Sequence, residues 1–285
     1  MHIKTGQKKK KKAKSAYKPL VPAVEQASRI LVCLGENPGF KLGVTEICRQ
    51  LRIHKSKGYS ILNTLKQFGF IEKDPQTKTY SLGAGLIFLS RNVLDNLNYP
   101  EIAAPFLDNL ARDTSGTAAF GLISGTHVIV IANRGGNQNI GFGLRPGHRF
   151  HITLGAHGKA IVAFLNEPER EKVLTKKNLH FYGDISRMDM KRLREEVATY
   201  RRLGYAWDIG EVTPGVNVVS APVFGIGEKV IGCIILIGTF TESRIEEYGP
   251  TVANAATQIS HKLGAKVAPL YRTPFLSKET GGIQR

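Results

Sequence analysis

Residues 44–82 read VTEICRQLRIHKSKGYSILNTLKQFGFIEKDPQTKTYSL. Their apolar residues recur at steps of three and four, which predicts a short helix over 44–51 and a longer helix over 55–68. Two extended runs within 70–82 then flank a turn that contains proline, which predicts a hairpin. An earlier amphipathic segment, 22–34, predicts another helix with proline in its first turn. Three helices, a tight turn between the second and third, and a two-stranded wing are typical of a winged helix-turn-helix.

The outer face of the predicted helix over 55–68 carries side chains suited to the DNA major groove, above an apolar inner face that would hold the helix on its scaffold. The candidate base-contacting residues are Lys55, Ser56, Lys57, Tyr59, Ser60 and Asn63, and the candidates for phosphate contact are Lys73 and Lys78 on the wing. The alternative is a small helical bundle whose third helix is solvated on one side. The hairpin that follows the two closely spaced helices favours the DNA-binding interpretation.

The charge of the chain also indicates a polyanionic partner. Its 285 residues carry 40 Lys and Arg against 23 Asp and Glu, a formal net charge of +17. Residues 1–20 hold eight lysines and no acidic residue, a composition that cannot bury apolar surface and predicts a disordered tail. Such a tail attracts phosphate through counterion release, although it can also be only a solubilising extension.

Composition excludes several classes of protein. The length suits about two domains, and the hydrophobic fraction of 42% is enough for packed cores. No apolar run approaches the ~18–20 residues of a membrane span, and the lysine-rich start does not resemble a secretory signal. Cys33, Cys48 and Cys233 are too few and too widely spaced for a disulfide framework or a zinc site. We therefore expect a soluble, cytoplasmic protein with no membrane partner.

The second half of the chain mixes strands and helices without regular βαβ spacing. After a connecting helix over 86–97, we expect helices over 102–112, 158–165, 189–203 and 241–263, and strands over 118–123, 127–132, 217–224 and 229–237. Such interspersed elements predict an α+β fold in which helices flank a mainly antiparallel sheet.

Two stretches of this second half carry a family likeness. One is GAHGKA at 155–160, and the other is LGYAWD at 203–208, which is followed by Glu211, by PGV at 214–216 and by APV at 221–223. With the helix-turn-helix segment, these motifs occur in the order typical of the IclR family of bacterial transcriptional regulators, which the chain resembles over most of its length. The resemblance implies a GAF-like C-terminal domain that binds a small effector, in a protein that acts on DNA as a homodimer or a dimer of dimers.

The predicted recognition helix departs from the family pattern, which often reads Lys-Ser-Thr, an apolar residue, His or Tyr, and then Arg. This chain has KSKGYS at 55–60 and therefore lacks arginine, the commonest reader of guanine. Lys57 can replace arginine only as a point charge without the planar fork. Gly58 should also cost the helix about 1 kcal/mol relative to alanine. We expect an operator that differs from those of better-known relatives.

The resemblance also implies where a small acid would bind, at the start of the Gly-Lys-Ala helix and on the later strands. The matching positions are Ala156, His157, Asp208, Val218, Ile235 and Ile237, with Trp207 beside Asp208. Helix N-termini attract anions. In relatives that bind very small keto acids the last three positions are a cysteine and two serines, whereas here they are branched aliphatics. We therefore expect an effector with an aromatic or other largely apolar body and a carboxylate or thioester near the helix start. The alternative is that these aliphatics only fill the sheet core.

The sequence predicts no metal site, cofactor or catalytic centre. His148, His151 and His157 fall close together, but no cysteine or carboxylate cluster joins them, and Thr153 stands where the family often has histidine. The glycines over 141–147 enclose a proline and do not form a dinucleotide fingerprint. No GxSxG or HExxH motif is present. We therefore expect a protein that is not an enzyme.

These observations predict five segments. They are a basic tail over 1–20, a winged helix-turn-helix domain over 21–84, a linker helix over 85–98, an effector domain over 99–270 and a C-terminal tail over 271–285. The leading interpretation is a sequence-specific transcriptional regulator whose partners are a double-stranded DNA operator, a small effector and further copies of itself, with RNA polymerase as another candidate. The alternative is a sequence-independent nucleic-acid-coating protein that uses the lysine tail, with the second domain as an assembly module.

Overall fold

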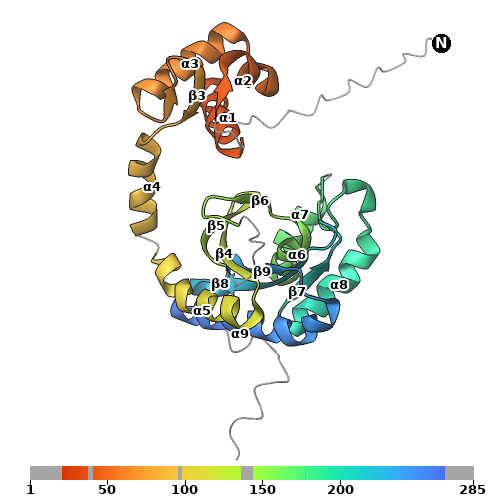
Figure 1. Cartoon of the computed structure of the whole chain (residues 1–285). Coiled ribbons are helices and arrows are strands. Elements are labelled where there is room, and N and C mark those ends of the chain that lie inside the picture. The colour runs from red at the N-terminus through yellow and green to blue at the C-terminus, as the bar shows by residue number, and fades with distance from the viewer. Residues whose placement is uncertain (1–20, 38–40, 96–97, 136–143, 177, 267–285) are drawn as a thin grey trace, which may run out of the picture. The chain divides into compact units, whose positions relative to one another are not determined.

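The structure, a computed structural model, divides the chain into two compact units, 1–96 and 97–285 (Figure 1). The described residues are 21–37, 41–95, 98–135, 144–176 and 178–266. The predicted tails, 1–20 and 271–285, lie outside them. Within the described part of the chain, no helix is both long enough and apolar enough to span a membrane.

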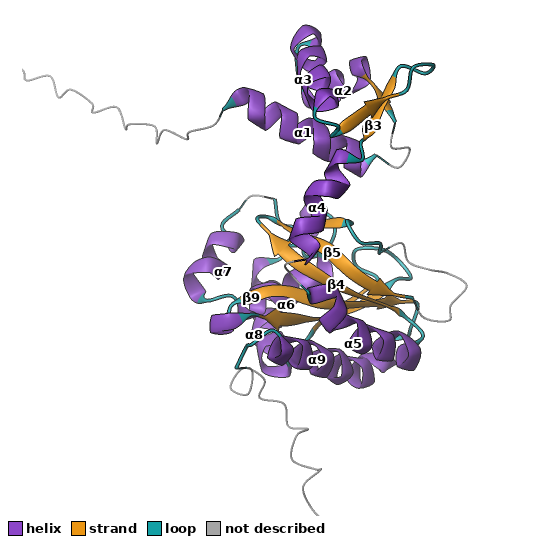
Figure 2. Cartoon of the chain, turned by 90° about the vertical axis from the view of Figure 1, so that its left-hand side faces the viewer, coloured by secondary structure: helices purple, strands orange, loops and turns teal. Residues whose placement is uncertain are grey.

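The N-terminal unit combines helices with a small sheet (Figure 2). Its elements are α1 (Pro22–Glu36), β1 (Leu42–Gly43), α2 (Val44–Leu51), α3 (Lys55–Gln67), β2 (Ile71–Lys73), β3 (Thr79–Leu82) and α4 (Gly85–Asp95). Among the described residues the strands pair antiparallel in the order β1-β3-β2, so β2 and β3 form the wing and β1 extends it. The sequence predicted two strands because β1, with two residues, is too short to show any alternation.

An apolar core holds this unit together. Ile30 and Leu34 of α1 pack with Ile47 of α2, Leu62 of α3 and Tyr80 of β3, and all five are essentially inaccessible to solvent. Burying each such side chain contributes about 1.5–3 kcal/mol to folding. The prediction of a winged helix-turn-helix is confirmed, because the apolar faces of the three helices meet at this core and leave the other faces free.

Gly58 has a packing role that its low helix propensity does not reveal. It lies on the buried face of α3, and a Cβ built there would collide with the Sγ of Cys48 on α2. Glycine therefore lets α3 lie close against α2. The low helix propensity of glycine is offset by this close packing of the two helices.

The C-terminal unit contains one antiparallel sheet. Its main elements are α5 (Tyr99–Thr114), β4 (Thr117–Ser124), β5 (His127–Arg134), β6 (Arg149–His151), α6 (Gly155–Phe164), α7 (Glu167–Leu174), α8 (Met190–Leu203), β7 (Ala206–Ile209), β8 (Asn217–Phe224), β9 (Val230–Gly238) and α9 (Ile245–Lys262). In the described part of this unit, six strands follow the order β6-β5-β4-β9-β8-β7, and every neighbouring pair is antiparallel. The predicted α+β fold class is confirmed.

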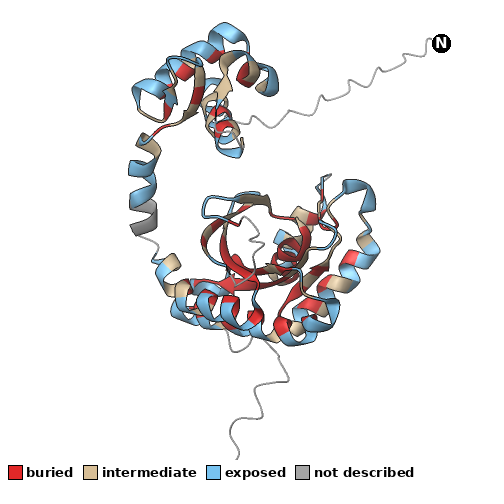
Figure 3. Ribbon diagram, viewed as in Figure 1, coloured by how far each residue is buried: buried red, intermediate tan, exposed pale blue. Residues whose placement is uncertain are grey.

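Helices flank the curled sheet. α5 and α9 lie side by side and pack on β4, β5, β8 and β9, whereas α6 packs on β7, β8 and β9 and is itself covered by α8 (Figure 1). Figure 3 shows that burial is concentrated in the strands and in the helix faces turned toward them, while the outer helix faces are exposed. A continuous core joins Leu107 of α5, Phe120 of β4, Ile234 of β9 and Val252 of α9.

Several elements differ from the sequence prediction. α6 begins at Gly155, three residues before the predicted start, because Gly155 takes a positive φ of 48° that propensity does not anticipate. β6, β7 and α7 were not predicted: the two strands have three and four residues, and α7 is highly charged and buries only Leu174. The predicted helix over 241–263 is a short 3-10 turn followed by α9.

Candidate DNA-binding surface and effector pocket

The outer face of α3 presents every base-contact candidate to solvent. Lys55, Ser56, Lys57, Tyr59, Ser60 and Asn63 are exposed, while Gly58, Leu62 and Leu65 are buried beneath them. Within the described ranges, neither Lys55 nor Lys57 forms an ion pair. The helix therefore offers two uncommitted ammonium groups and several short hydrogen-bonding side chains, the donors and acceptors needed for direct readout of base edges.

The two lysines of the wing differ in the contacts that their ammonium groups make. The Lys73 ammonium lies 5.8 Å from the ring centroid of Tyr59 and 5.4 Å from that of Tyr80, so it ties the wing to the exposed face of α3. Lys78 is exposed at the wing turn with a positive φ of 58°, and its ammonium donates to the carbonyl of Pro75. Lys73 is thus positioned beside the exposed face of α3, whereas Lys78 would have to leave its own turn to contact phosphate.

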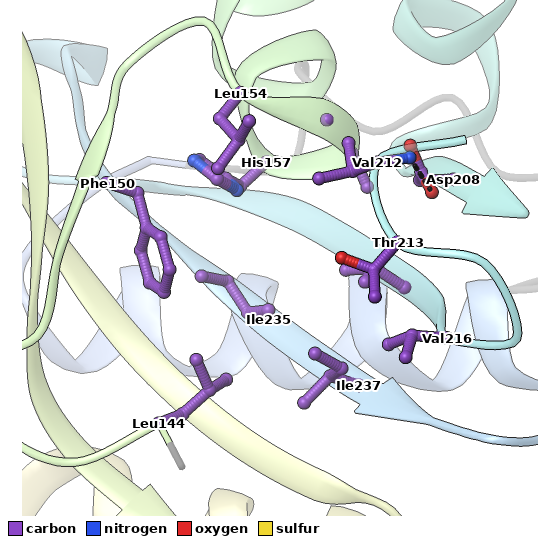
Figure 4. A pocket seen from close by; sticks show the side chains of 13 residues that line it. Leu144, Phe150, Leu154, His157, Asp208, Val212, Thr213, Val216, Ile235 and Ile237 are labelled. Carbon is purple, nitrogen blue, oxygen red and sulfur yellow. Dashed lines mark hydrogen bonds between the residues drawn. The ribbon is translucent and has the colours of Figure 1, made fainter. Parts of the chain in front are cut away.

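A cavity of about 190 Å³ opens between α6 and the sheet of the C-terminal unit (Figure 4). It is lined by Leu144, Phe150, Leu154, Gly155, Ala156, His157, Asp208, Val212, Thr213, Val216, Val218, Ile235 and Ile237. Most of these side chains are aliphatic or aromatic. No lysine or arginine lines the cavity within the described residues.

The register of the sheet brings the pocket residues together. Asp208 of β7 stands opposite Val218 of β8, and Val218 stands opposite Ile237 of β9, which forms one row across three strands. Ile235 lies two residues from Ile237 and therefore on the same face. Ala156 and His157 approach this row from the first turn of α6.

Trp207 is the one predicted effector residue that the structure does not bring into the pocket. Successive residues of a strand point to opposite faces, so Trp207 points away from the side that Asp208 lines. Its ring instead contacts Tyr200 and Tyr205, with centroids 4.8 and 5.9 Å away.

Glycines fix the start of α6 against the pocket. A Cβ on Gly155 would lie 3.0 Å from the Cγ2 of Val212 and 3.6 Å from the Oδ2 of Asp208, and its φ is positive. A Cβ on Gly158 would collide with the backbone of Thr153. The glycines of the GAHGKA motif therefore allow the helix N-terminus to sit directly beside Asp208.

Burial sets the charge state of both titratable groups in the pocket. It lowers the pKa of His157 to about 4, so this imidazole is neutral at pH 7, and its Nε2 lies 3.3 Å from the carbonyl oxygen of His151. Burial raises the pKa of Asp208, while the Val212 and Glu211 amides and the Lys159 ammonium oppose that rise. The pocket consequently contains a neutral histidine and a buried carboxyl group.

A buried ion cluster supports the loop that forms one wall. The Lys159 ammonium, on a side chain only 1% exposed, lies 3.1 Å from carboxylate oxygens of both Glu196 and Glu211, and Arg192 pairs with the same two carboxylates. Burial alone would raise the pKa of Glu211, but these two cations lower it. Because Glu211 precedes the pocket residues Val212 and Thr213, the cluster fixes that wall to α6 and α8.

The three histidines considered as a metal site do not form one in the described part of the chain, where no group of three or more His, Cys, Asp or Glu side chains could hold a metal ion. His151 bonds through Nδ1 to the hydroxyl of Thr153 at 2.7 Å, and its ring packs edge-on against His127 and His180. His148 packs on Phe150.

Family models match both units of the chain. The model of the IclR helix-turn-helix domain matches residues 23–75, and the model described as bacterial transcriptional regulator IclR C-terminal matches residues 91–261. The chain belongs to the IclR family of bacterial transcriptional regulators. It therefore pairs a DNA-binding helix-turn-helix domain with a C-terminal effector-binding domain, and the sequence-independent coating protein is not favoured.

Relatives of this IclR-family regulator match along nearly their whole length. The chain is 27% identical over 250 residues to the HTH-type transcriptional regulator XynR of Escherichia coli (strain K12), covering 86% of this chain and 98% of that protein. It is 25% identical over 266 residues to the transcriptional repressor IclR of the same strain, covering 88% and 97%. These homologues are regulators of transcription, not enzymes.

Solved structures share the fold of this IclR-family chain. The IclR transcriptional regulator of Alicyclobacillus acidocaldarius is 26% identical with a TM-score of 0.74, covering 85% of this chain and 98% of that one. An IclR homologue from Microbacterium hydrocarbonoxydans, crystallised with 4-hydroxybenzoate, is 18% identical with a TM-score of 0.70, covering 85% and 99%. The second likeness, at that identity, concerns the fold alone.

Sequence reasoning missed seven pocket-lining residues of this IclR-family domain. They are Leu144, Phe150, Leu154, Gly155, Val212, Thr213 and Val216. Most of them lie on loops or on the three-residue strand β6, where no periodicity identifies an inward face. The one available signal was proximity to the motifs, since Val212 to Val216 follow Asp208 and Glu211 closely.

Proposed function

We propose that this protein regulates transcription by binding an operator through α3 and the wing, under the control of a largely apolar acid bound in the C-terminal pocket. The observation that carries the proposal is the pocket itself, which places aliphatic and aromatic walls beside the N-terminus of α6. A helix N-terminus favours an anionic group. The walls favour an aromatic or alicyclic body.

The apolar floor argues against a very small polar effector. Val218, Ile235 and Ile237 offer no hydrogen-bond donors, and Phe150 adds an aromatic wall. A cavity of about 150 Å³ lined by apolar side chains is known to take up benzene. The present cavity of about 190 Å³ therefore suits one ring with small substituents, and 4-hydroxybenzoate, the ligand of one relative, is a compound of that class.

We assign operator contact to the exposed residues of α3. Lys55, Ser56, Lys57, Tyr59, Ser60 and Asn63 would face base edges, and Lys73 and Lys78 would face phosphate. The effector-binding set is Ala156, His157, Asp208, Val218, Ile235 and Ile237, joined by the loop residues around Thr213.

We further propose that the protein works as a homodimer or a dimer of dimers. Ile87, Phe88 and Leu89 on α4 are 70, 72 and 48% exposed, and adjacent large apolar side chains of this kind are typical of protein interfaces. A two-fold dimer would match an inverted-repeat operator. RNA polymerase would be a further partner, the cytoplasm the location, and the protein would have no enzymatic activity.

The domain bounds that we propose are the ones predicted from the sequence. The DNA-binding domain would span 21–84, the linker helix 85–98 and the effector domain 99–270, with tails over 1–20 and 271–285. The family matches at 23–75 and 91–261 support the division into a DNA-binding domain and an effector domain.

Isothermal titration calorimetry on the full chain tests the effector class. The probes are benzoate, 4-hydroxybenzoate and cyclohexanecarboxylate, against glyoxylate and pyruvate as short keto acids. We expect cyclic acids to bind and to raise the melting temperature, because a ligand of the native state stabilises it. Binding of the keto acids alone would contradict the proposal.

A further inference from the structure

The outer wall of the pocket is the loop over 210–216, which joins β7 to β8. Figure 4 shows the side chains of Val212, Thr213 and Val216 along one side of the cavity that they line. Residues 213–215 are exposed, so this loop lies between the cavity and solvent. A segment that is packed on one side only needs anchors elsewhere to keep a defined position.

Glu211, the single charged residue of this loop, supplies a side-chain anchor. Its carboxylate lies 3.1 Å from the Lys159 ammonium and also pairs with Arg192. Lys159 belongs to α6 and Arg192 to α8, so one carboxylate connects the loop to two helices that pack on each other. The Lys159 side chain is only 1% exposed, and loss of a partner would leave part of its buried charge uncompensated.

Glu196 makes the same two ion pairs from another place in the fold. Its carboxylate also lies 3.1 Å from the Lys159 ammonium and pairs with Arg192, and the side chains of Glu196 and Glu211 are 18 and 23% exposed. Glu196 belongs to α8, however, whereas Glu211 directly precedes the pocket-lining Val212. The two carboxylates are therefore alike in burial and in partners, and they differ in whether they hold the outer wall.

Backbone bonds join the loop to the sheet and to itself. The Glu211 amide donates to Oδ1 of Asp208 on β7 at 3.1 Å, and the exposed Arg187 donates to the Glu211 carbonyl at 3.1 Å. The Gly210 amide donates to the carbonyl of Val216 at 3.2 Å, which closes the loop on itself. The connection of the outer wall to α6 and α8 therefore runs through the carboxylate of Glu211.

We propose that Glu211 is a positioning residue for effector binding, because its salt bridges to Lys159 and Arg192 hold the outer wall where the bound effector requires it. This inference rests on the proposed function, in which the pocket binds a cyclic acid. Without the carboxylate, the wall occupies that position for a smaller fraction of the time, and the apparent affinity for the effector falls by the same fraction.

Matched substitutions in the full chain test the role of Glu211. Glu211→Gln and Glu196→Gln remove the same charge from the same two cations, so both should lower the melting temperature. Calorimetry with 4-hydroxybenzoate is done at a temperature where both variants are folded. We expect Glu211→Gln to bind this probe about fivefold to tenfold more weakly than the unmodified protein, and Glu196→Gln to bind within about twofold of it. Equal affinities of the two variants would overturn the proposal and leave the proposed function standing.

Hydrogen exchange of the outer wall needs no ligand, so it separates failure of this proposal from failure of the proposed function. We expect the amides of 210–216 to exchange about fivefold or more faster in Glu211→Gln than in Glu196→Gln. Equal exchange in the two variants would overturn the proposal whichever acid binds. Failure of all cyclic acids to bind the unmodified protein, with a clear difference in exchange, would overturn the proposed function alone.

Aspartate variants repeat the comparison if a glutamine variant does not fold. Glu211→Asp and Glu196→Asp keep the charge of the cluster and shorten only the reach of the carboxylate, so the fold should persist. We expect Glu211→Asp to bind 4-hydroxybenzoate about twofold or more weakly than Glu196→Asp does. Equal affinities would again overturn the proposal.

Discussion

Gly58 shows how packing and propensity predict opposite results for one substitution. Helix propensity predicts that Gly58→Ala stabilises the protein by about 1 kcal/mol. The contact of a Cβ with the Sγ of Cys48 predicts instead a destabilisation of about 1–3 kcal/mol. We expect the second result, seen as faster amide hydrogen exchange across α3 (Lys55–Gln67).

A second substitution separates overpacking from any other effect of the alanine. Cys48→Ala removes the sulfur, so the double variant should be more stable than the sum of the single changes by about 1 kcal/mol or more. Strict additivity would show that the Cys48 contact is not the cause.

His157 makes the stability of the C-terminal unit depend on pH. Its pKa is about 4 in the folded protein and about 6.5 in the unfolded chain. Between these values the unfolded state binds more protons, so stability falls as the pH drops. We expect a loss of about 2 kcal/mol between pH 7 and pH 5 from this group. Urea unfolding followed by the fluorescence of the single tryptophan, Trp207, measures it.

The control for the pH prediction is a neutral side chain. His157→Gln should remove about 2 kcal/mol of the pH dependence. A smaller dependence should remain, because burial and the neighbouring His180, His127 and Lys176 also lower the pKa of His151. An unchanged pH profile in this variant would show that His157 does not contribute.

At the scale of elements, the sequence predicted the helices and strands whose apolar residues recur at regular spacing. The bounds predicted for α2 (Val44–Leu51) and α3 agree with the structure to within one residue, because the apolar residues on their buried faces recur regularly. The effector residues on β7, β8 and β9 were identified through the family motifs, and the strand register explains why they meet. The same register accounts for Trp207, whose position one residue from Asp208 puts it on the other face.

Loops could not be predicted in this way. Val212, Thr213 and Val216 reach the pocket because the Lys159 cluster and the amide bonds to Asp208 fix the loop. The contact between Lys159 and Glu211 joins residues 52 positions apart, and no local pattern encodes it. Phe150 lies on a three-residue edge strand, too short for alternation to show.

The Lys159 cluster should stabilise the C-terminal unit far more than an exposed pair does. Lys159→Met leaves Glu196 and Glu211, which are only 18 and 23% exposed, with Arg192 as their one remaining cation among the described residues. We expect a loss of about 2–3 kcal/mol, discounted from the cost of a fully buried pair. Arg194→Met breaks the exposed pair with Glu171 and should cost less than about 1 kcal/mol. Equal losses in urea unfolding would contradict the role of the buried cluster.

Substitution of two lysines on opposite sides of α3 tests whether this helix reads the operator sequence. Lys57 and Lys66 are both exposed, but nine residues separate them, which places them on opposite sides of the helix. We expect Lys57→Ala to weaken binding to operator by about 1–3 kcal/mol and to scrambled duplex by less. Lys66→Ala should preserve the ratio of the two affinities, measured by fluorescence anisotropy at fixed salt. Deletion of residues 1–20 should weaken both alike, and the reverse pattern would remove the assignment of specificity to α3.

At the scale of the whole molecule, operator binding and self-association should be coupled through α4 (Gly85–Asp95). Phe88 is 72% exposed beside two other large apolar residues, so a charge there would disrupt an interface without disturbing the core of the monomer. We expect Phe88→Glu to shift the protein to monomer in sedimentation velocity. Because a dimer contacts two half-sites together, operator affinity should fall about a hundredfold or more.

Two measurements show whether that loss arises from assembly. Binding of a cyclic acid to the C-terminal pocket should be unchanged in Phe88→Glu, since Phe88 lies in the other compact unit. Ile226→Glu introduces the same charge at a residue that is 83% exposed on the turn between β8 (Asn217–Phe224) and β9 (Val230–Gly238), and it should leave operator binding intact. A dimeric Phe88→Glu protein with full operator affinity would exclude α4 as the dimer interface, because a buried glutamate pair at a two-fold axis would be strongly unfavourable.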